Sequence, residues 1–190
     1  AWQVRKKLGS PVLFTQLRPG KGEKIFKMYK FRTMTDERDA RGNLLPDEQR
    51  MTEFGKFLRE SSLDELPELW DVLIGNMSFV GPRPDVPGYA DKLEGDDRDV
   101  LKLRPGITGP ATLKYRLEDE MISEYVAKKQ AEGDTRSMQE IAIEYNDKVI
   151  YPDKVRLNCY YYRHYSFWKD IEMIFATVLG FKVKFAGEEV

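Results

Sequence analysis

Cysteine and histidine are almost absent from this chain of 190 residues, which contains one of each, Cys159 and His164. A single cysteine cannot form a disulfide within the chain, and neither residue has the neighbours that a zinc site needs. The sequence therefore predicts a protein of a reducing, cytosol-facing environment that has no zinc site at these residues.

Long apolar runs and an excess of one charge are missing as well. The longest apolar stretch, residues 173–181, is far shorter than the ~20 residues of a membrane-spanning helix. As given, the chain is not expected to cross a membrane. Lys plus Arg number 31 against 32 for Asp plus Glu, and this balance argues against a globally basic nucleic-acid-binding protein. Because 41% of the residues are hydrophobic, residues 1–190 are expected to form one domain around one core.

Turn residues and side-chain alternation divide the N-terminal part of the chain into predicted elements. Residues 12–16 and 25–31 are rich in β-prone residues and enclose a turn at 18–22, which predicts a hairpin with lysines along its second strand. The charged segment 36–46 is expected to be a surface loop. A helix capped by Asp47 should follow. One face of this helix is expected to carry Met51, Phe54, Phe57 and Leu58.

Helical patterns dominate the rest of the chain. Residues 61–75 are predicted to form a helix that begins with hydroxyl and acidic side chains and ends at a glycine. Charged helices are predicted at 118–130, 135–145 and 153–163. A last helix, capped by Ser166, is expected to carry an apolar stripe. The stripe consists of Phe167, Ile171, Ile174, Phe175 and Val178.

Together these patterns predict an α+β fold, a single helix-rich domain with short strands near the N-terminus and after Pro105. Amphipathic helices are expected to lie on its surface. The last helix is one candidate for a position on a bilayer, because Lys182 and Lys184 follow its apolar stripe, although packing against the core explains the stripe equally well. The charged segment 117–150 has no role that the sequence reveals and is interpreted as a solvated helical hairpin.

Asp64 and Glu65 are candidates for chemistry because they lie at the predicted start of a helix. Unpaired backbone N–H groups and the helix dipole favour negative charge there, so both are expected to be ionised at neutral pH. An ionised aspartate can act as a nucleophile. The same residues fit a capping box, in which Glu65 bonds back to Ser62, and on this motif alone capping is favoured. If Pro67 is instead the first helical residue, the acidic pair lies just outside the helix and is free to act.

Isolated cations can supply the other half of a phosphate chemistry. Arg83 lies between Pro82 and Pro84, which fix the backbone on both sides of a guanidinium whose planar shape suits phosphate. A rigid connector with a solvated or ion-paired arginine fits these residues about as well. The other candidates lie mostly beside proline, glycine or predicted strand ends: Lys30, Arg32, Arg104 and Arg116. Most isolated Lys and Arg side chains are simply solvated.

Five separated motifs run through nearly the whole chain. They are Pro11-Val12-Leu13-Phe14-Thr15-Gln16, Lys30-Phe31-Arg32-Thr33-Met34, Ser62-Leu63-Asp64-Glu65-Leu66-Pro67, Gly75-Asn76-Met77-Ser78-Phe79-Val80-Gly81-Pro82-Arg83-Pro84 and Arg104-Pro105-Gly106-Ile107-Thr108-Gly109. In order and spacing they resemble the motifs of bacterial sugar transferases, the monotopic phosphoglycosyl transferases. Five motifs in register are far more specific than one, so the resemblance favours a catalytic Asp64 over the capping box.

The resemblance implies transfer of a phosphosugar from a UDP-sugar to undecaprenyl phosphate at the cytoplasmic face of the bacterial inner membrane, with release of UMP. This would be the first membrane step of a surface glycan, and later glycosyltransferases, but no nucleic acid, are expected as further partners. Asp64 corresponds to the family's nucleophile and would form an aspartyl-phosphosugar, so ping-pong kinetics are expected. Glu65 would hold Mg²⁺. The cations expected to bind the phosphates are Lys30, Arg83, Arg104 and Arg116.

The chain departs from the family pattern at two places. Family members usually begin with a hydrophobic re-entrant helix, and this chain starts just after the point where that helix would end, so we expect a truncated chain. Residues 110–120 also differ from the segment that many members have there. This difference leaves the identity of the sugar open.

Two other functions would use the same residues. A metal-dependent phosphohydrolase would use water in place of the lipid phosphate. A catalytically weak, membrane-associated scaffold would recruit later glycosyltransferases through the helical segment 117–150. Replacing Asp64 by Asn should abolish transfer if Asp64 is the nucleophile and should leave partner binding intact if the protein only scaffolds.

Overall fold

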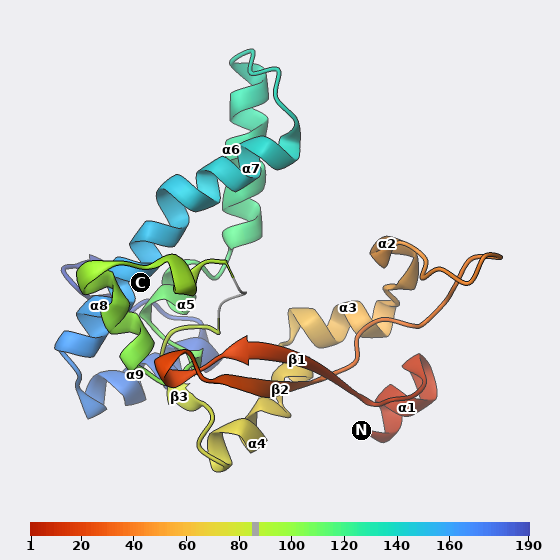
Figure 1. Ribbon diagram of the computed structural model, residues 1–190, viewed down its shortest axis with the longest axis horizontal. Helices are drawn as coiled ribbons and strands as arrows, with labels where there is room; N and C mark the ends of the chain where they lie inside the picture. Colours follow the sequence, from red (N-terminus) through yellow and green to blue (C-terminus); the bar gives the residue numbers. More distant parts are fainter. Residues whose placement is uncertain (85–87) are drawn as a thin grey trace. The chain divides into compact units, whose positions relative to one another are not determined.

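The computed structural model describes residues 1–84 and 88–190, which fall into two compact units. Unit 1 comprises Ala1–Pro19 and Lys24–Met77, and unit 2 comprises Gly20–Glu23 and Ser78–Val190. Both units combine helices with short strands, which confirms the predicted helix-rich α+β class (Figure 1). Within the described ranges, no helix is both long and apolar enough to span a bilayer. That residues 1–190 act as one catalytic domain stays a prediction.

Unit 1 is built on a helix and a β-hairpin. The helix α1 (Trp2–Leu8) precedes the antiparallel strands β1 (Leu13–Pro19) and β2 (Ile25–Phe31), whose register runs from Leu13 opposite Phe31 to Pro19 opposite Ile25. The predicted hairpin is therefore confirmed. A small core holds α1 to the hairpin and to the helix that follows. Its buried members are Val4, Leu8 and Leu58, and Val12, Phe31 and Phe54 pack against them.

The helix predicted to begin at Asp47 is two helices, α2 (Asp47–Arg50) and α3 (Glu53–Glu60). Met51 adopts an extended conformation between them, which ends α2. Thr52 then caps α3, because its hydroxyl accepts a hydrogen bond from a backbone N–H one turn further on. The prediction of Asp47 as the cap of a single helix was wrong. The apolar residues had the right spacing, but Met51 is not part of the helix that carries the others.

Residues 61–75 also form two short helices where one was predicted, the 3₁₀ helix η2 (Leu63–Glu65) and α4 (Glu68–Leu73). Ser62 lies in the left-handed region with φ 54°, and in the described structure its side chain makes no capping hydrogen bond. The capping box is therefore not formed. Pro67 occupies the N-cap position of α4, where the missing N–H costs nothing. Asp64 and Glu65 thus lie outside α4, as the alternative interpretation of the sequence required.

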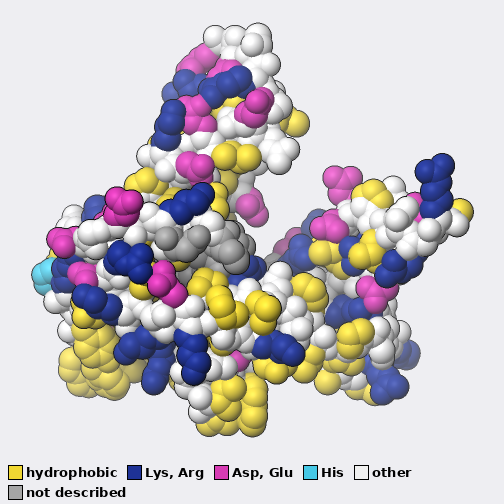
Figure 2. Space-filling view, viewed as in Figure 1, with side chains coloured by type: hydrophobic (Ala, Val, Ile, Leu, Met, Phe, Trp, Pro, Cys, Tyr) yellow, Lys and Arg dark blue, Asp and Glu magenta, His cyan; other side chains and the backbone are white. Residues whose placement is uncertain are grey.

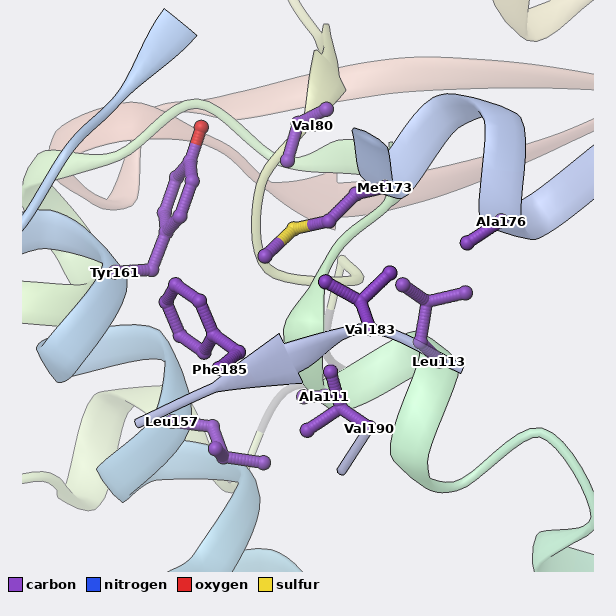
Figure 3. Close-up of a cluster of buried hydrophobic side chains, with 10 residues drawn as sticks. All are labelled: Val80, Ala111, Leu113, Leu157, Tyr161, Met173, Ala176, Val183, Phe185 and Val190. Atoms are coloured by element: carbon purple, nitrogen blue, oxygen red, sulfur yellow. The ribbon is translucent and has the colours of Figure 1, made fainter. Parts of the chain in front are cut away.

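Unit 2 has a hydrophobic core between its helices and short strands. The strands β3 (Ser78–Val80) and β4 (Gly106–Thr108) pair in parallel, so the strand expected after Pro105 is confirmed. The core side chains come from β3, from the helices α5 (Pro110–Lys114), α8 (Tyr151–Arg163) and α9 (Phe167–Leu179), and from the C-terminal hairpin of β5 (Lys184–Phe185) and β6 (Glu188–Glu189) with its flanking residues. The buried members, drawn in Figure 3, are Val80, Ala111, Leu113, Leu157, Tyr161, Met173, Ala176, Val183, Phe185 and Val190.

The charged parts of unit 2 lie outside this core. In the stretch from 85 to 104, residues 85–87 lie outside the described residues, and the remainder forms the 3₁₀ helices η3 (Ala90–Lys92) and η4 (Gly95–Lys102). The helices α6 (Glu118–Ala131) and α7 (Met138–Tyr145) form a projecting hairpin (Figure 1), which confirms the solvated helical hairpin predicted there. A π-helical turn (Asn146–Ile150) connects this hairpin to α8.

The helix α9 exposes part of its predicted apolar stripe. Met173 and Ala176 are fully buried against the core, whereas Phe167, Phe175 and Val178 are 58%, 55% and 76% exposed. The helix was predicted correctly, but its stripe is divided, because Ile174 packs against the core of unit 2 and Ile171 is half-buried. An exposed apolar face remains on the opposite side.

Candidate active site

In unit 1, one lysine from β2 lies between two glutamates from the segment that leads into α4. The Lys30 Nζ lies 2.7 Å from Glu65 Oε1 in η2 and 3.2 Å from Glu68 Oε1 at the start of α4. These side chains are 17%, 16% and 4% exposed, so water screens their attraction only weakly. Asp71, also in α4, is fully buried, and its Oδ2 accepts a hydrogen bond from the Tyr29 N–H at 3.2 Å. Contacts at Lys30 and at Tyr29 therefore hold η2 and α4 against β2.

Asp64 is half-buried beside this group. Burial raises the pKa of its carboxyl, and the negative charge of Glu65 raises it further, while Lys30 and Arg59 lower it by less. The sequence placed Asp64 at a helix start and therefore favoured its ionised form. In the structure Asp64 lies in a 3₁₀ turn ahead of α4, and its burial disfavours the ionised form. A carboxylate of raised pKa is more basic and is therefore a stronger nucleophile.

Arg32, a further cation from the Lys30 motif, is engaged in holding unit 1 together. Its guanidinium donates to the backbone oxygens of Leu8 and Ser10, at 3.2 and 2.9 Å, and to Asp36 Oδ2 at 2.5 Å. These bonds tie the end of α1 to the end of β2. The structure therefore assigns Arg32 a structural role.

Three glycines pack backbone against backbone where β3 and β4 lie side by side in unit 2. A Cβ on Gly81 would lie 2.3 Å from the Arg104 oxygen, one on Gly106 would lie 2.2 Å from the Gly81 nitrogen, and one on Gly109 would lie 2.4 Å from the Gly81 oxygen. No side chain larger than hydrogen fits at such distances. These glycines therefore allow two motifs distant in sequence, 81–84 and 104–109, to meet.

This close packing sets the positions of Arg83 and Arg104. The Gly106 N–H donates to the Pro82 oxygen at 2.8 Å, so the residue before Arg83 is bonded to the residue two places after Arg104. Both arginine side chains are exposed. In unit 2, two of the predicted cations therefore lie on backbone segments that are hydrogen-bonded to each other.

Arg116 contacts the end of a helix. Its side chain is exposed, and its Nη2 donates to the backbone oxygen of Thr177 near the C-terminal end of α9. Arginines commonly hydrogen-bond the last carbonyls of helices and stabilise the negative end of the dipole. The structure gives Arg116 this role, and phosphate binding by Arg116 stays a prediction.

Of the predicted site residues, the structure brings Lys30, Asp64 and Glu65 together in unit 1 and joins the segments that carry Arg83 and Arg104 in unit 2. Sequence reasoning missed Glu68 and Asp71. Their spacing of three residues puts both on one face of α4, and this was the signal in the sequence. It was overlooked because buried faces of helices are expected to be apolar.

Unit 2 also contains a cleft of about 550 Å³. Its lining residues are Lys21, Gly22, Glu23, Arg98, Leu101, Lys102 and Tyr162, and the predicted site residues are not among them. The Glu23 carboxylate lies 3.2 Å from Arg98, and the Lys102 ammonium lies 5.3 Å from the centre of the Tyr162 ring. Two cations of the cleft, Arg98 and Lys102, are thus engaged by neighbouring side chains.

A resident metal has no ready-made cage: within 1–84 and 88–190, no three His, Cys, Asp or Glu side chains are placed to hold one. Mg²⁺ that arrives with substrate phosphates needs only one or two carboxylates from the protein. Glu65, partly exposed and acidic, meets this smaller requirement. The residues therefore fit an ion shared with a phosphate ligand.

Residues 1–183 match the bacterial sugar transferase family, and the chain belongs to this family. It is 52% identical over 113 residues to an uncharacterized sugar transferase, EpsL, of Bacillus subtilis, an overlap of 60% of this chain and 56% of that protein. It is 34% identical over 184 residues to the UDP-glucose:undecaprenyl-phosphate glucose-1-phosphate transferase of Klebsiella pneumoniae, covering 94% of this chain and 34% of the relative.

A third relative acts on a different sugar by its name. The chain is 32% identical over 173 residues to the UDP-N-acetylgalactosamine-undecaprenyl-phosphate N-acetylgalactosaminephosphotransferase of Aeromonas hydrophila, covering 88% of this chain and 34% of that protein. The chain thus spans about half the length of the Bacillus relative and about a third of the other two. The resemblance drawn from the five motifs is confirmed.

Proposed function

We propose that this protein transfers a phosphosugar from a UDP-sugar to undecaprenyl phosphate and releases UMP. The names of the Klebsiella and Aeromonas relatives support this reaction class. The observation that carries the proposal is the placement of Asp64 and Glu65 in a turn ahead of α4, with the Lys30 ammonium beside them. The reaction would begin the membrane stage of a surface glycan, and later glycosyltransferases would then take up the product.

Asp64 is the proposed nucleophile. Its carboxylate oxygen attacks the phosphorus that bears the sugar, the bond from this phosphorus to the UMP oxygen breaks, and UMP leaves as an anion. An oxygen of undecaprenyl phosphate then attacks the same phosphorus, and Asp64 leaves as a carboxylate. Its raised pKa and the engagement of Glu65 by Lys30 favour Asp64 over its neighbour for this role. The double displacement predicts ping-pong kinetics.

Mg²⁺ is proposed as the cation that accompanies the donor, with Glu65 as its protein ligand. Bound there, it would supply the positive charge that attack of a carboxylate on a diphosphate requires. Lys30 adds one positive charge from β2. Asp64, Glu65, Glu68 and the buried Asp71 are four carboxylates of this part of unit 1, so the phosphates of the donor need cations besides Lys30. Arg83, Arg104 and Arg116 are the proposed phosphate-binding cations of unit 2.

The cytoplasmic face of the bacterial inner membrane is the proposed location, and α4 supports a monotopic attachment there. This helix buries Glu68 and Asp71 and exposes Leu69, Trp70 and Leu73 by 45%, 56% and 75%. Figure 2 shows hydrophobic side chains gathered over this helix. An apolar face is stable when lipid covers it, and the lipid acceptor would be met at such a surface.

A test of the proposal measures UMP release by the 190-residue chain in detergent, with a panel of UDP-sugars, Mg²⁺ and undecaprenyl phosphate. We expect lipid-dependent UMP release from one donor, lost in Asp64→Asn and kept in the exposed control Asp119→Asn. Lipid-independent release would identify a phosphohydrolase. No release from any donor by the folded protein would favour a scaffold.

A further inference from the structure

Glu68 is a buried carboxylate that the proposed reaction does not use. Its residue is only 3% exposed, and its Oε1 lies 3.2 Å from the Lys30 Nζ. Removing a carboxylate from water is costly even when it is paired with a cation. A glutamine of the same shape would fill the space at the start of α4 without that cost. Lys30 is a charged partner on which the Glu68 carboxylate acts directly.

The ammonium of Lys30 is shared between two carboxylates. A lysine has three N–H donors, and here one is directed to Glu65 at 2.7 Å and another lies near Glu68 at 3.2 Å. The shorter contact is to Glu65, the residue proposed to bind the cation of the donor. A cation at Glu65 must therefore compete with Lys30 for the same carboxylate.

We propose that Glu68 is a positioning residue that retains the Lys30 ammonium when Glu65 turns to the metal–diphosphate donor. This inference rests on the proposed function. With Glu68 present, Lys30 keeps an anionic partner and stays beside the site after Glu65 has moved. Without the charge of Glu68, Lys30 is drawn more strongly to Glu65, and the donor's cation binds less well.

The experiment uses calorimetry to measure equilibrium binding of UDP to the whole chain at a series of Mg²⁺ concentrations. No lipid acceptor is present, so there is no turnover. For Glu68→Gln we expect the Mg²⁺ concentration at half-maximal UDP binding to rise by about fivefold. Glu60→Gln is the matched control, because the same change is made at an exposed residue of α3. It should leave the Mg²⁺ dependence unchanged.

A double variant separates an action through Lys30 from the loss of a nearby negative charge. If Glu68 acts through Lys30, then Glu68→Gln in the background of Lys30→Met should shift the Mg²⁺ dependence by less than about twofold. A shift as large as that in the native background would overturn the positioning role. Glu68→Asp, which keeps the charge on a shorter side chain, should restore part of the affinity for Mg²⁺.

The outcomes for the wild-type chain distinguish this inference from the proposed function. If wild type binds UDP but Glu68→Gln leaves its Mg²⁺ dependence unchanged, the positioning role is wrong and the proposed function stands. If wild type binds no UDP at any Mg²⁺ concentration, both are wrong. Should Glu68→Gln fail to fold, Glu68→Asp provides the test, because the inference predicts a smaller shift in the same direction and an unchanged dependence would overturn it.

Discussion

The surroundings of Asp64 disfavour the ionised form of its carboxyl group. Burial and the neighbouring Glu65 both raise the pKa of its carboxyl, and the nearby cations offset this only in part. For a carboxyl group, a pKa that is higher in the folded than in the unfolded state makes ionisation destabilising. The cost is absent at low pH, where Asp64 is protonated in both states, and is complete above the folded-state pKa. A reactive carboxylate is thus held at the expense of stability.

Replacing Asp64 by Asn should therefore stabilise the fold while it abolishes transfer. The rise in Tm should be larger at pH 7 than at pH 4, because the ionised form is the one that burial disfavours. Thermal unfolding followed by circular dichroism at both pH values measures the difference. Asp119→Asn, at an exposed position in the first turn of α6, should show no such pattern. An Asp64→Asn protein less stable than wild type at pH 7 would contradict this account.

At the scale of elements, α4 buries its polar face and exposes its apolar face. Its acidic residues Glu68 and Asp71 are buried, and its large apolar residues are exposed. The sequence showed the helical period of these residues but not which side is covered, because the period is the same whether the apolar face meets a core or a lipid. The helix α9 gave the same ambiguity. Three of its five predicted stripe residues are exposed, and Ile174 of the stripe packs against the core together with Met173 and Ala176.

Leu73→Asp should weaken membrane association, since Leu73 is 75% exposed on the apolar face of α4 and contributes nothing to the buried side. Loss of one leucine side chain from lipid and the addition of a charge should reduce liposome binding by at least about tenfold. Flotation with liposomes of bacterial lipids measures it. Ile143→Asp on α7, also an exposed apolar position, is the control and should float as wild type does. Equal flotation of both variants would argue against a role for α4.

On the second candidate helix, α9, Val178→Asp should also reduce flotation with liposomes, and flotation equal to that of wild type would argue against contact of α9 with lipid. Val178 is 76% exposed, so the substitution disturbs the surface and not the core of unit 2.

Backbone contact between β3 and β4 is the second feature that belongs to the scale of elements. Gly106→Ala would place a Cβ 2.2 Å from the Gly81 nitrogen, and backbone atoms cannot move aside as a flexible side chain can. We expect a loss of about 3 kcal/mol in the free energy of unfolding. Gly133→Ala serves for comparison, because Gly133 has φ +91° but open space around it, and strain alone should cost about 1 kcal/mol. Denaturant unfolding of both variants gives the two values.

At the scale of the whole molecule, the sequence predicted the parts of the candidate site better than their pairing. The hairpin and most helices follow from local patterns, and Asp64, Glu65 and Lys30 were identified by motif. The contact of Lys30 with Glu65 joins residues far apart in the chain, and no local pattern encodes it. The spacing of Glu68 and Asp71 showed that they share a face of α4, but the burial of Glu68 depends on where β2 lies relative to α4.

The C-terminal hairpin is held to α5 and α8 by an ion network that should make unit 2 sensitive to acid. The Glu188 carboxylate accepts hydrogen bonds from Lys114, at 2.5 Å, and from Arg156, and these bonds lower its pKa. A lowered pKa means that the stabilisation is complete above the pKa of the unfolded state and is lost as pH falls through the folded-state pKa. The network therefore stabilises the protein at neutral pH and not in strong acid.

Glu188→Gln should reduce the free energy of unfolding by about 1 kcal/mol at pH 7, equivalent to about 2–4 °C in Tm. The difference from wild type should shrink below about pH 4, where the glutamate of the wild type becomes protonated. Thermal scans across this pH range measure it. The neighbouring Glu189→Gln, whose carboxylate is more exposed and lies 3.7 Å from Lys182, should change Tm little at any pH. A pH-independent effect of Glu188→Gln would contradict the ionic explanation.

Unit 2 is not one continuous stretch of chain, because it takes in Gly20–Glu23 from the tip of the hairpin as well as Ser78–Val190. A gene fragment that starts at Ser78 would omit three of the residues that line the cleft, and one of them, Glu23, pairs with Arg98. Dividing the gene at Ser78 would therefore leave the second fragment without part of the lining of its cleft. Truncated versions for crystallography or for spectroscopic labelling should therefore keep residues 20–23.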